Sequence, residues 1–246
     1  MNGLFGFQPQ FEEEREILPD PVGESWSGRR FRAGLDLAAL EQEEQVRLVQ
    51  RVFLLPAAKA PHTVVFCGVE SGSGATRVCA RTAETLASQA KGSVCLVDAN
   101  VRTPSLHDCY GRKNHRGLTD ALLHSHPIRD LVNPVNGGNL WLLSCGSTVP
   151  DPYLLFTAER LGACLVELRQ QFDFVLVDAP PVNAFADAPL LAKLADGVVL
   201  VVQANSTRRE AAKNAVERLT AAKVQLLGAV LNKRRFPIPQ ALYRRF

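Results

Sequence analysis

Three short segments of the chain carry residue types that could bind a phosphate group and a metal ion. The first is Glu70-Ser-Gly-Ser-Gly-Ala-Thr76, in which Gly72 and Gly74 allow the backbone to curl. Curled backbone presents N–H groups to an anion, and a helix that begins after the loop adds its own. A phosphate loop also needs a lysine for the β- and γ-phosphates and a Ser or Thr for Mg²⁺. Thr76 fills the second position, but the lysine position holds Ala75.

The other two segments each bring an aspartate to the end of an apolar run. Asp98 follows Cys-Leu-Val, and Asp178 follows Phe-Val-Leu-Val. A carboxylate at a strand end can hold the water shell of Mg²⁺ or accept a proton from an attacking hydroxyl. Either aspartate could instead cap the next turn, and a loop with two glycines is more often structural when it stands alone. Together, however, the three segments predict one site for a phosphate and a metal ion.

Apolar runs and helix-length segments alternate along the chain and would position these residues. Strands are expected at 63–69, 94–97, 140–144, 174–177, 198–202 and 224–231. Helices are expected at 76–90, 158–171, 188–195 and 207–222. Runs without polar alternation are typical of strands buried on both faces, and helices between them indicate right-handed crossovers. The pattern predicts an α/β fold with a doubly wound, mainly parallel sheet, whose ligands bind at the carboxyl ends of strands.

Composition divides the chain into three parts. Residues 1–35 mix glycine, proline and charges without a sustained period, which predicts a mobile N-terminal arm. Residues 36–235 form the α/β domain, which opens with an amphipathic helix ending near Pro56. The chain ends in a basic stretch from Lys233 to Arg245, of which residues 236–246 form a short tail beyond the domain. We expect this basic stretch to be dispensable for folding and to lie near the nucleotide end of the sheet or the inner membrane surface.

Charge and composition exclude several classes of protein. The net charge of +3 over 246 residues is too small to predict binding to nucleic acid. The chain has no signal-peptide pattern and no apolar run of the roughly 20 residues that a membrane-spanning helix needs. The 6 cysteines form no Cys-x-x-Cys pair, which is typical of buried side chains in a reducing compartment. We therefore expect a cytoplasmic protein, or one held at the inner membrane through a partner.

In order and spacing, the three segments resemble the bacterial tyrosine kinases of capsular and exopolysaccharide synthesis, which are relatives of the MinD/ParA ATPases. The resemblance covers about residues 36–235 and includes later pieces at 195–198, 207–210 and 230–232. Its most characteristic part is Asp-x-Asn-x-Arg-x-Pro-x-x-His, from Asp98 to His107. The resemblance implies a P-loop NTPase fold of the MinD/ParA type, with ATP or ADP and Mg²⁺ as cofactor.

The resemblance also implies a role for each matching residue. Asp98 and Asp178 would be the catalytic carboxylates, and both would hold the metal ion together with Thr76. The phosphates would lie on the loop after the first strand, and adenine would contact the end of the last strand. The residues implied to bind the nucleotide are Gly72, Ser73, Gly74, Ala75, Thr76, Arg77 and Asn232.

The chain departs from the family pattern where charge matters most. Ala75 replaces the loop lysine, Glu70 stands where relatives carry a second lysine, and Asn100 replaces an acid. Arg77 could supply the missing charge, but the next helical position points about 100° away. A lysine at the phosphates contributes roughly 1.5–3 kcal/mol per charge-assisted bond, so its loss predicts ten- to a hundred-fold weaker ATP binding or worse. Tyr243 alone stands where family members carry a tail cluster of tyrosines.

These features predict a degenerate, pseudokinase-like member of the family. It would regulate or scaffold exopolysaccharide synthesis or export, with weak or no nucleotide binding. Two alternatives stay open: an active ATP-dependent protein-tyrosine autokinase with a rearranged loop, and a MinD/ParA-like ATPase, which the segment 98–107 disfavours. Whether the chain is an enzyme is thus left open by the sequence.

The resemblance implies partners as well as a cofactor. These are a membrane-anchored polysaccharide co-polymerase or adaptor, an intact kinase paralogue, and further copies of the chain. The last follows from Glu44 and Arg47, which resemble the first two positions of the family's Glu-x-x-Arg-x-x-Arg assembly motif. The third position holds Gln50, with Arg51 beside it.

Overall fold

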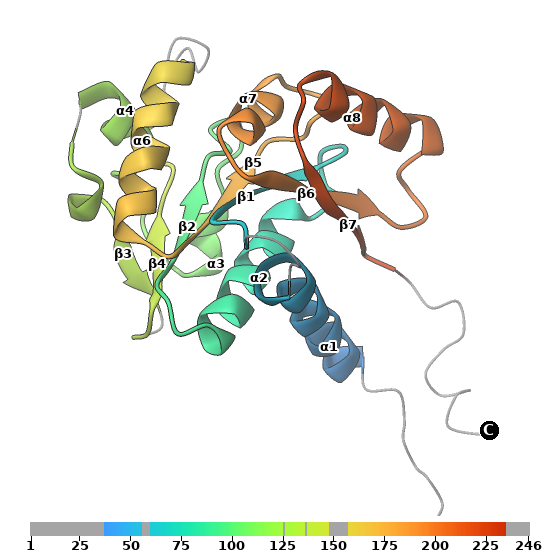
Figure 1. Ribbon diagram of the computed structural model, residues 1–246, viewed down its shortest axis with the longest axis horizontal. Helices are drawn as coiled ribbons and strands as arrows, with labels where there is room; N and C mark the ends of the chain where they lie inside the picture. Colours follow the sequence, from blue (N-terminus) through green and yellow to red (C-terminus); the bar gives the residue numbers. More distant parts are fainter. Residues whose placement is uncertain (1–36, 56–59, 125, 136, 148–156, 235–246) are drawn as a thin grey trace, which may run out of the picture.

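Helices cover both faces of a mainly parallel sheet that follows the alternation seen in the sequence (Figure 1). The computed structural model describes residues 37–55, 60–124, 126–135, 137–147 and 157–234. Within these ranges the sheet has 7 strands in the order β3-β4-β2-β5-β1-β6-β7. The predicted α/β fold with a doubly wound, mainly parallel sheet is confirmed. The predicted arm at 1–35 and tail at 236–246 lie outside the described residues.

The strands lie close to the predicted positions, with one addition. They are β1 Thr63–Gly68, β2 Val94–Asp98, β3 Asn133–Val135, β4 Leu140–Leu143, β5 Phe174–Ala179, β6 Gly197–Gln203 and β7 Leu226–Asn232. Neighbouring strands are parallel except β3, which pairs with β4 in the antiparallel direction. The sequence did not predict β3, because it is short and contains Pro134, which is tolerated at a sheet edge but typical of turns.

The helices differ more from the expected boundaries. They are α1 Leu37–Val49, α2 Ala75–Gln89, α3 Leu106–Cys109, α4 Leu118–His124, α6 Ala158–Gln171, α7 Asp187–Lys193 and α8 Arg209–Ala221, with a π-helix η1 Gln50–Leu54 and a 3₁₀-helix η2 Ile128–Asp130. The single helix expected before Pro56 is thus an α-helix that ends in a π turn. Helix α8 begins later than predicted because the Thr207 hydroxyl accepts a hydrogen bond from the Gln203 N–H and holds a turn.

Alternate residues of the central strands face two separate hydrophobic cores. In β1, Val65 and Cys67 pack with helices α4, α6, α7 and α8, whereas Val64 and Phe66 pack with α1, η1, α2 and α3. All four side chains are fully buried. Since neither face meets water, no polar residue is needed between them, which explains the continuous apolar runs. Within the described ranges, no helix combines the length and apolar composition that crossing a bilayer requires.

The chain topology brings several polar residues to one edge of the sheet. The phosphate-loop candidate follows β1, Asp98 ends β2, and Asp178 lies at the end of β5. Because these strands are parallel, their carboxyl ends meet at the same edge. Asp98 and Asp178 face each other directly in the register of β2 and β5. Asn232 ends β7, two strands away from β1.

Candidate functional site

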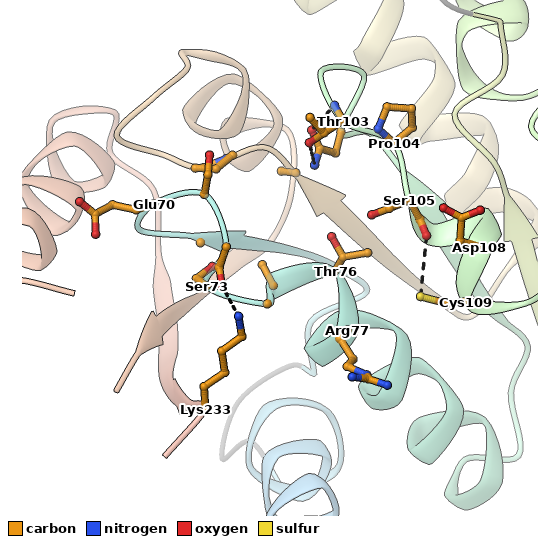
Figure 2. Close-up of a pocket in the computed structure, with 18 residues that line it drawn as sticks. Glu70, Ser73, Thr76, Arg77, Thr103, Pro104, Ser105, Asp108, Cys109 and Lys233 are labelled. Atoms are coloured by element: carbon orange, nitrogen blue, oxygen red, sulfur yellow. Dashed lines mark hydrogen bonds between the residues drawn. The ribbon is translucent and has the colours of Figure 1, made fainter. Parts of the chain in front are cut away.

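A cavity of about 690 Å³ opens at this edge of the sheet (Figure 2). Its volume falls in the range of roughly 300–1,000 Å³ that small-molecule sites occupy in proteins. The wall consists of the loop after β1, the segment after β2, the end of β5 and one residue beyond β7. The lining residues are Gly68, Glu70, Ser71, Gly72, Ser73, Gly74, Ala75, Thr76, Arg77, Asn100, Thr103, Pro104, Ser105, Asp108, Cys109, Ala179, Pro181 and Lys233.

Two glycines give the loop after β1 its shape. Gly72 has a φ of +81° and Gly74 a φ of +84°, a region that residues with a Cβ rarely adopt. A Cβ at Gly74 would also collide with the side-chain amide of Asn232. Helix α2 starts immediately afterwards, and its Gly74 cap offers no side-chain acceptor to the first turn. The N–H groups at this helix start are therefore available to an anion, as the sequence predicts.

Thr76 and Asp178 form the part of the site that suits a metal ion. The Thr76 Oγ1 hydroxyl donates a 2.7 Å hydrogen bond to Asp178 Oδ2. The other oxygen, Oδ1, is buried and has no hydrogen-bond partner among the described residues. Burial raises the pKa of Asp178 well above its usual value, and the neighbouring Asp98 charge raises it further. A hydroxyl beside a carboxylate with a spare oxygen fits a hard divalent cation such as Mg²⁺, which would also offset the buried charge.

Both carboxylate oxygens of Asp98 accept hydrogen bonds from the backbone that follows β2. One carboxylate oxygen accepts from the Asn100 N–H at 3.2 Å, and the other from the N–H groups of Ser105 and Leu106 at 3.1 and 3.0 Å. Burial raises the pKa of Asp98 to about 6, although these hydrogen bonds act in the opposite direction. Asp98 thus caps helix α3, one of the two roles that the sequence left open. Neither Asp98 nor its neighbour Asp178 is among the residues that line the cavity, and the catalytic and metal-binding roles of both stay predictions.

The loop carries no cation of its own at the phosphate position. Ala75 is buried at the cavity wall with only a methyl group. Arg77 lines the cavity, but Figure 2 shows its side chain extending along α2 away from the loop, as the helical geometry predicts. Glu70 is exposed, and its carboxylate points away from Thr76 in the same view. We therefore expect Glu70 to repel a bound phosphate less than its sequence position suggested.

The residue that does bring positive charge to the loop is Lys233, for which the sequence predicted a place near the nucleotide end of the sheet but no role at the phosphates. Lys233 Nζ donates a 2.6 Å hydrogen bond to the Gly72 carbonyl oxygen. Its neighbour Asn232, the implied adenine contact, donates through Nδ2 to the Ser73 carbonyl oxygen at 2.8 Å. The signal for its contact with the loop was the place of Lys233 directly after the last strand, whose end meets the same edge; the prediction from sequence rested only on the positive charge of the stretch from Lys233 to Arg245.

An ion pair holds the characteristic segment after β2 in place. Arg102 Nε lies 3.0 Å from Asp187 Oδ2 on α7, and the two side chains are only 16% and 4% exposed. The guanidinium also lies 4.8 Å from the ring centre of Phe185. Part of the Asp98–His107 motif is therefore structural, because it ties the cavity wall to helix α7.

Asp187→Asn should lower the free energy of unfolding by about 1.5 kcal/mol, since it removes the charge from a nearly buried hydrogen-bonded pair. For a domain of this size the melting temperature should fall by about 3–6 °C. The matched control is Asp130→Asn, since Asp130 is 60% exposed and its ion pair with Arg129 spans 3.9 Å. Thermal unfolding of the two variants should differ clearly, and equal melting temperatures would contradict the structural role of the pair.

Similarity to proteins of known sequence points to one family. No family model matches the chain. Tyrosine-protein kinase YwqD of Bacillus subtilis is 35% identical over 161 residues, which are 65% of this chain and 68% of that protein. CapB of Staphylococcus aureus is 32% identical over 164 residues, which are 67% of this chain and 72% of that protein.

Solved structures agree with the sequence comparison. The chimerical protein CapA2B2 matches with a TM-score of 0.74 and 27% identity, over 79% of this chain and 85% of that one. The kinase domain of the Escherichia coli tyrosine kinase ETK matches with a TM-score of 0.67 and 24% identity, over 72% and 71%. MinD, in the MinC:MinD complex of Aquifex aeolicus, shares the fold at a TM-score of 0.61 and 19% identity, over 71% and 69%. The predicted P-loop fold of the MinD/ParA type is confirmed.

Proposed function

The chain belongs to the bacterial tyrosine-protein kinases, and within this family we propose that it is a degenerate, pseudokinase-like member. It regulates or scaffolds exopolysaccharide synthesis or export, and it binds Mg-ATP or Mg-ADP weakly or not at all. The observation that carries the proposal is Ala75, a buried methyl group at the position where a phosphate-binding lysine is needed. Phosphoryl transfer depends mainly on positioned positive charge, so the loss of this lysine lowers the rate of transfer further than the affinity.

An active protein-tyrosine autokinase is the second candidate function. It is favoured by the hydrogen bond between Thr76 and Asp178, which keeps a metal-binding pair in place beside the cavity. Among the described residues, Tyr110 argues against it, because its side chain is partly buried and donates to the Ala80 carbonyl oxygen at 3.4 Å. Tyr153 and Tyr243 lie outside the described residues. A MinD/ParA-like ATPase has less support, because the 19% identity to MinD reports on the fold alone.

A comparison of two chromosomal variants tests the proposal in cells. Deletion of the gene removes scaffold and kinase together, whereas Asp178→Asn removes only the metal-binding carboxylate. A scaffold requires that deletion lowers the yield of extracellular polymer while Asp178→Asn leaves it unchanged at equal protein level. Loss of polymer in both strains, together with ATP-dependent labelling of tyrosine by the purified wild-type protein, would support the kinase instead.

We further propose that a membrane-anchored adaptor or co-polymerase recruits the chain to the inner membrane, where it joins further copies or an intact kinase paralogue. Helix α1 offers the contact surface. Its Arg47 pairs with Glu43 and Glu44 of the same helix, and all three side chains are more than half exposed. An Arg81–Glu41 bond of 2.7 Å joins α1 to α2. The charges are thus held in place and remain open to a partner.

Arg47→Glu combined with Arg51→Glu should weaken self-association, or binding to the adaptor's cytoplasmic tail, by roughly tenfold or more, because each reversal replaces attraction by repulsion. Light scattering over a range of concentrations measures the effect. The control is Lys213→Glu on α8, an exposed lysine with a single 3.6 Å ion pair to Glu217. A wild-type protein that stays monomeric at all concentrations, alone and with the adaptor tail, would contradict this role of α1.

A further inference from the structure

The end of strand β7 holds the phosphate loop at two consecutive positions. Asn232 donates to the Ser73 carbonyl oxygen at 2.8 Å, and Lys233 donates to the Gly72 carbonyl oxygen at 2.6 Å. These bonds join residues 159 and 161 positions apart in the sequence. The position of the lysine ammonium is therefore coupled to the conformation of the loop itself.

The backbone at Lys233 is arranged to make this contact. The Asn232 carbonyl oxygen accepts a 2.8 Å hydrogen bond from the Ala204 N–H, which anchors the strand end to the residue after β6. The chain then turns at Lys233, whose φ of +57° is a left-handed conformation that side chains with a Cβ seldom adopt. Strained backbone of this kind is concentrated at functional sites, because the surrounding structure must hold it.

Lys233 also lines the same cavity as Ala75 and Thr76. Among the described residues of the cavity wall, Arg77 and Lys233 are the cations. Figure 2 shows Lys233 extending toward the loop and Arg77 extending away from it. An ammonium has three N–H donors, and the Gly72 carbonyl takes one of them. Two donors therefore remain for the oxygens of an anion on the loop.

We propose that Lys233 is the phosphate-binding lysine of this site. It supplies from the end of β7 the charge that residue 75 does not supply from the start of α2. The ligand is a nucleoside di- or triphosphate with Mg²⁺, an assignment that rests on the proposed function. The ammonium must share or give up its bond to Gly72 to reach the phosphates, so binding is weaker than with a lysine at the helix start.

A double-mutant cycle between positions 75 and 233 tests the proposal. Mg-ADP is titrated calorimetrically into the wild type, Lys233→Met, Ala75→Lys and the combined variant. Lys233→Met should weaken binding about tenfold or more in the wild-type background, which corresponds to at least about 1.4 kcal/mol. In the Ala75→Lys background the same change should cost less than about threefold, because the new lysine already neutralises the phosphates.

The choice of the test variant and two control variants separate charge from structure. Lys233→Met keeps a Cβ at the left-handed position, so its backbone strain equals that of the wild type. Lys233→Arg keeps the positive charge, so it should retain most of the Mg-ADP affinity that Lys233→Met loses. Lys213→Met removes a lysine that does not line the cavity and should leave binding unchanged. Thermal unfolding of each variant checks that the domain is folded.

If Lys233→Met lowers the Mg-ADP affinity equally with Ala or Lys at position 75, the proposal is overturned. Lys233 would then only stabilise the conformation of the loop. The proposal is equally overturned by a Lys233→Met variant that binds like the wild type. Wild-type protein that does not bind at about 5 mM Mg-ADP, beside an Ala75→Lys variant that does, would also overturn it while leaving the scaffold function intact. Tight nucleotide binding by the wild type, together with labelling of its own tyrosines, would instead contradict the scaffold function. The double-mutant cycle would then still decide whether Lys233 binds the phosphates.

Discussion

Ala75→Lys should strengthen Mg-ATP binding by roughly ten- to a hundred-fold, the effect of one or two charge-assisted hydrogen bonds to the phosphates. Ala75 lines the cavity as the first residue of α2, so a lysine there extends toward the loop. The glycine backbone and the Thr76–Asp178 pair are in place around it. What the loop lacks is therefore a local charge and not its shape.

Glu70→Ser should add less to this gain, because the Glu70 carboxylate is exposed and points away from Thr76 (Figure 2). Exposed charges are screened by water and salt, so we expect no more than about 1 kcal/mol from removing this one. The matched control for Ala75→Lys is Gln89→Lys, which adds one positive charge at the exposed far end of α2. Calorimetric titration of the three variants measures the effects. If the variant that combines Ala75→Lys with Glu70→Ser does not bind Mg-ATP, the cavity has changed beyond the loop.

Asp178→Asn should stabilise the ligand-free protein relative to the wild type, and this gain in the free energy of unfolding should increase as pH rises. Burial raises the pKa of Asp178 far above its usual value. Between the unfolded and the folded pKa the native state therefore binds more protons than the unfolded state, and the stability of the wild type falls as pH rises. The asparagine side chain does not titrate in this range, so the free energy of unfolding of the variant does not fall for this reason. Below about pH 4 both side chains are neutral, and the two proteins should be nearly equal.

Urea or thermal unfolding at several pH values between 4 and 9 would measure this gap. For a domain of this size, each kcal/mol shifts the melting temperature by about 2–4 °C. Asp130→Asn serves as the control, because the Asp130 side chain is 60% exposed and the stability gap between this variant and the wild type should depend little on pH. A gap between Asp178→Asn and wild type that is the same at pH 5 and pH 9 would mean that Asp178 does not carry a buried, costly charge.

The central strands could be predicted from the sequence because a single structural environment explains their short, uninterrupted apolar runs. β1, β2 and β5 are buried on both faces, and only a strand between two helical layers accommodates such short apolar runs. The segment between β2 and β4 could not be predicted in this way. Its elements α3, α4, η2 and β3 are short and mix polar with apolar residues. Hydrogen bonds between distant residues hold this segment, such as the one from Arg112 to the Pro134 carbonyl oxygen.

The sequence also predicted part of the candidate site, namely the residues that the strand order brings together. Thr76 and Asp178 both follow from topology, because the carboxyl ends of parallel strands meet at one edge. The hydrogen bonds of Asp98 to the backbone and the contact of Lys233 with Gly72 depend on where a side chain turns after its strand ends. Tertiary packing decides that direction, and the periodicity of a sequence carries no information about it.

The central claim is that the chain has lost efficient nucleotide use with its loop lysine. Calorimetric titration of the wild-type protein with Mg-ATP tests this claim most directly. We expect a dissociation constant in the high micromolar range or weaker, since the missing bonds are worth roughly 1.5–3 kcal/mol each. A dissociation constant in the low micromolar range, with the protein labelling its own tyrosines in the same mixture, would contradict it.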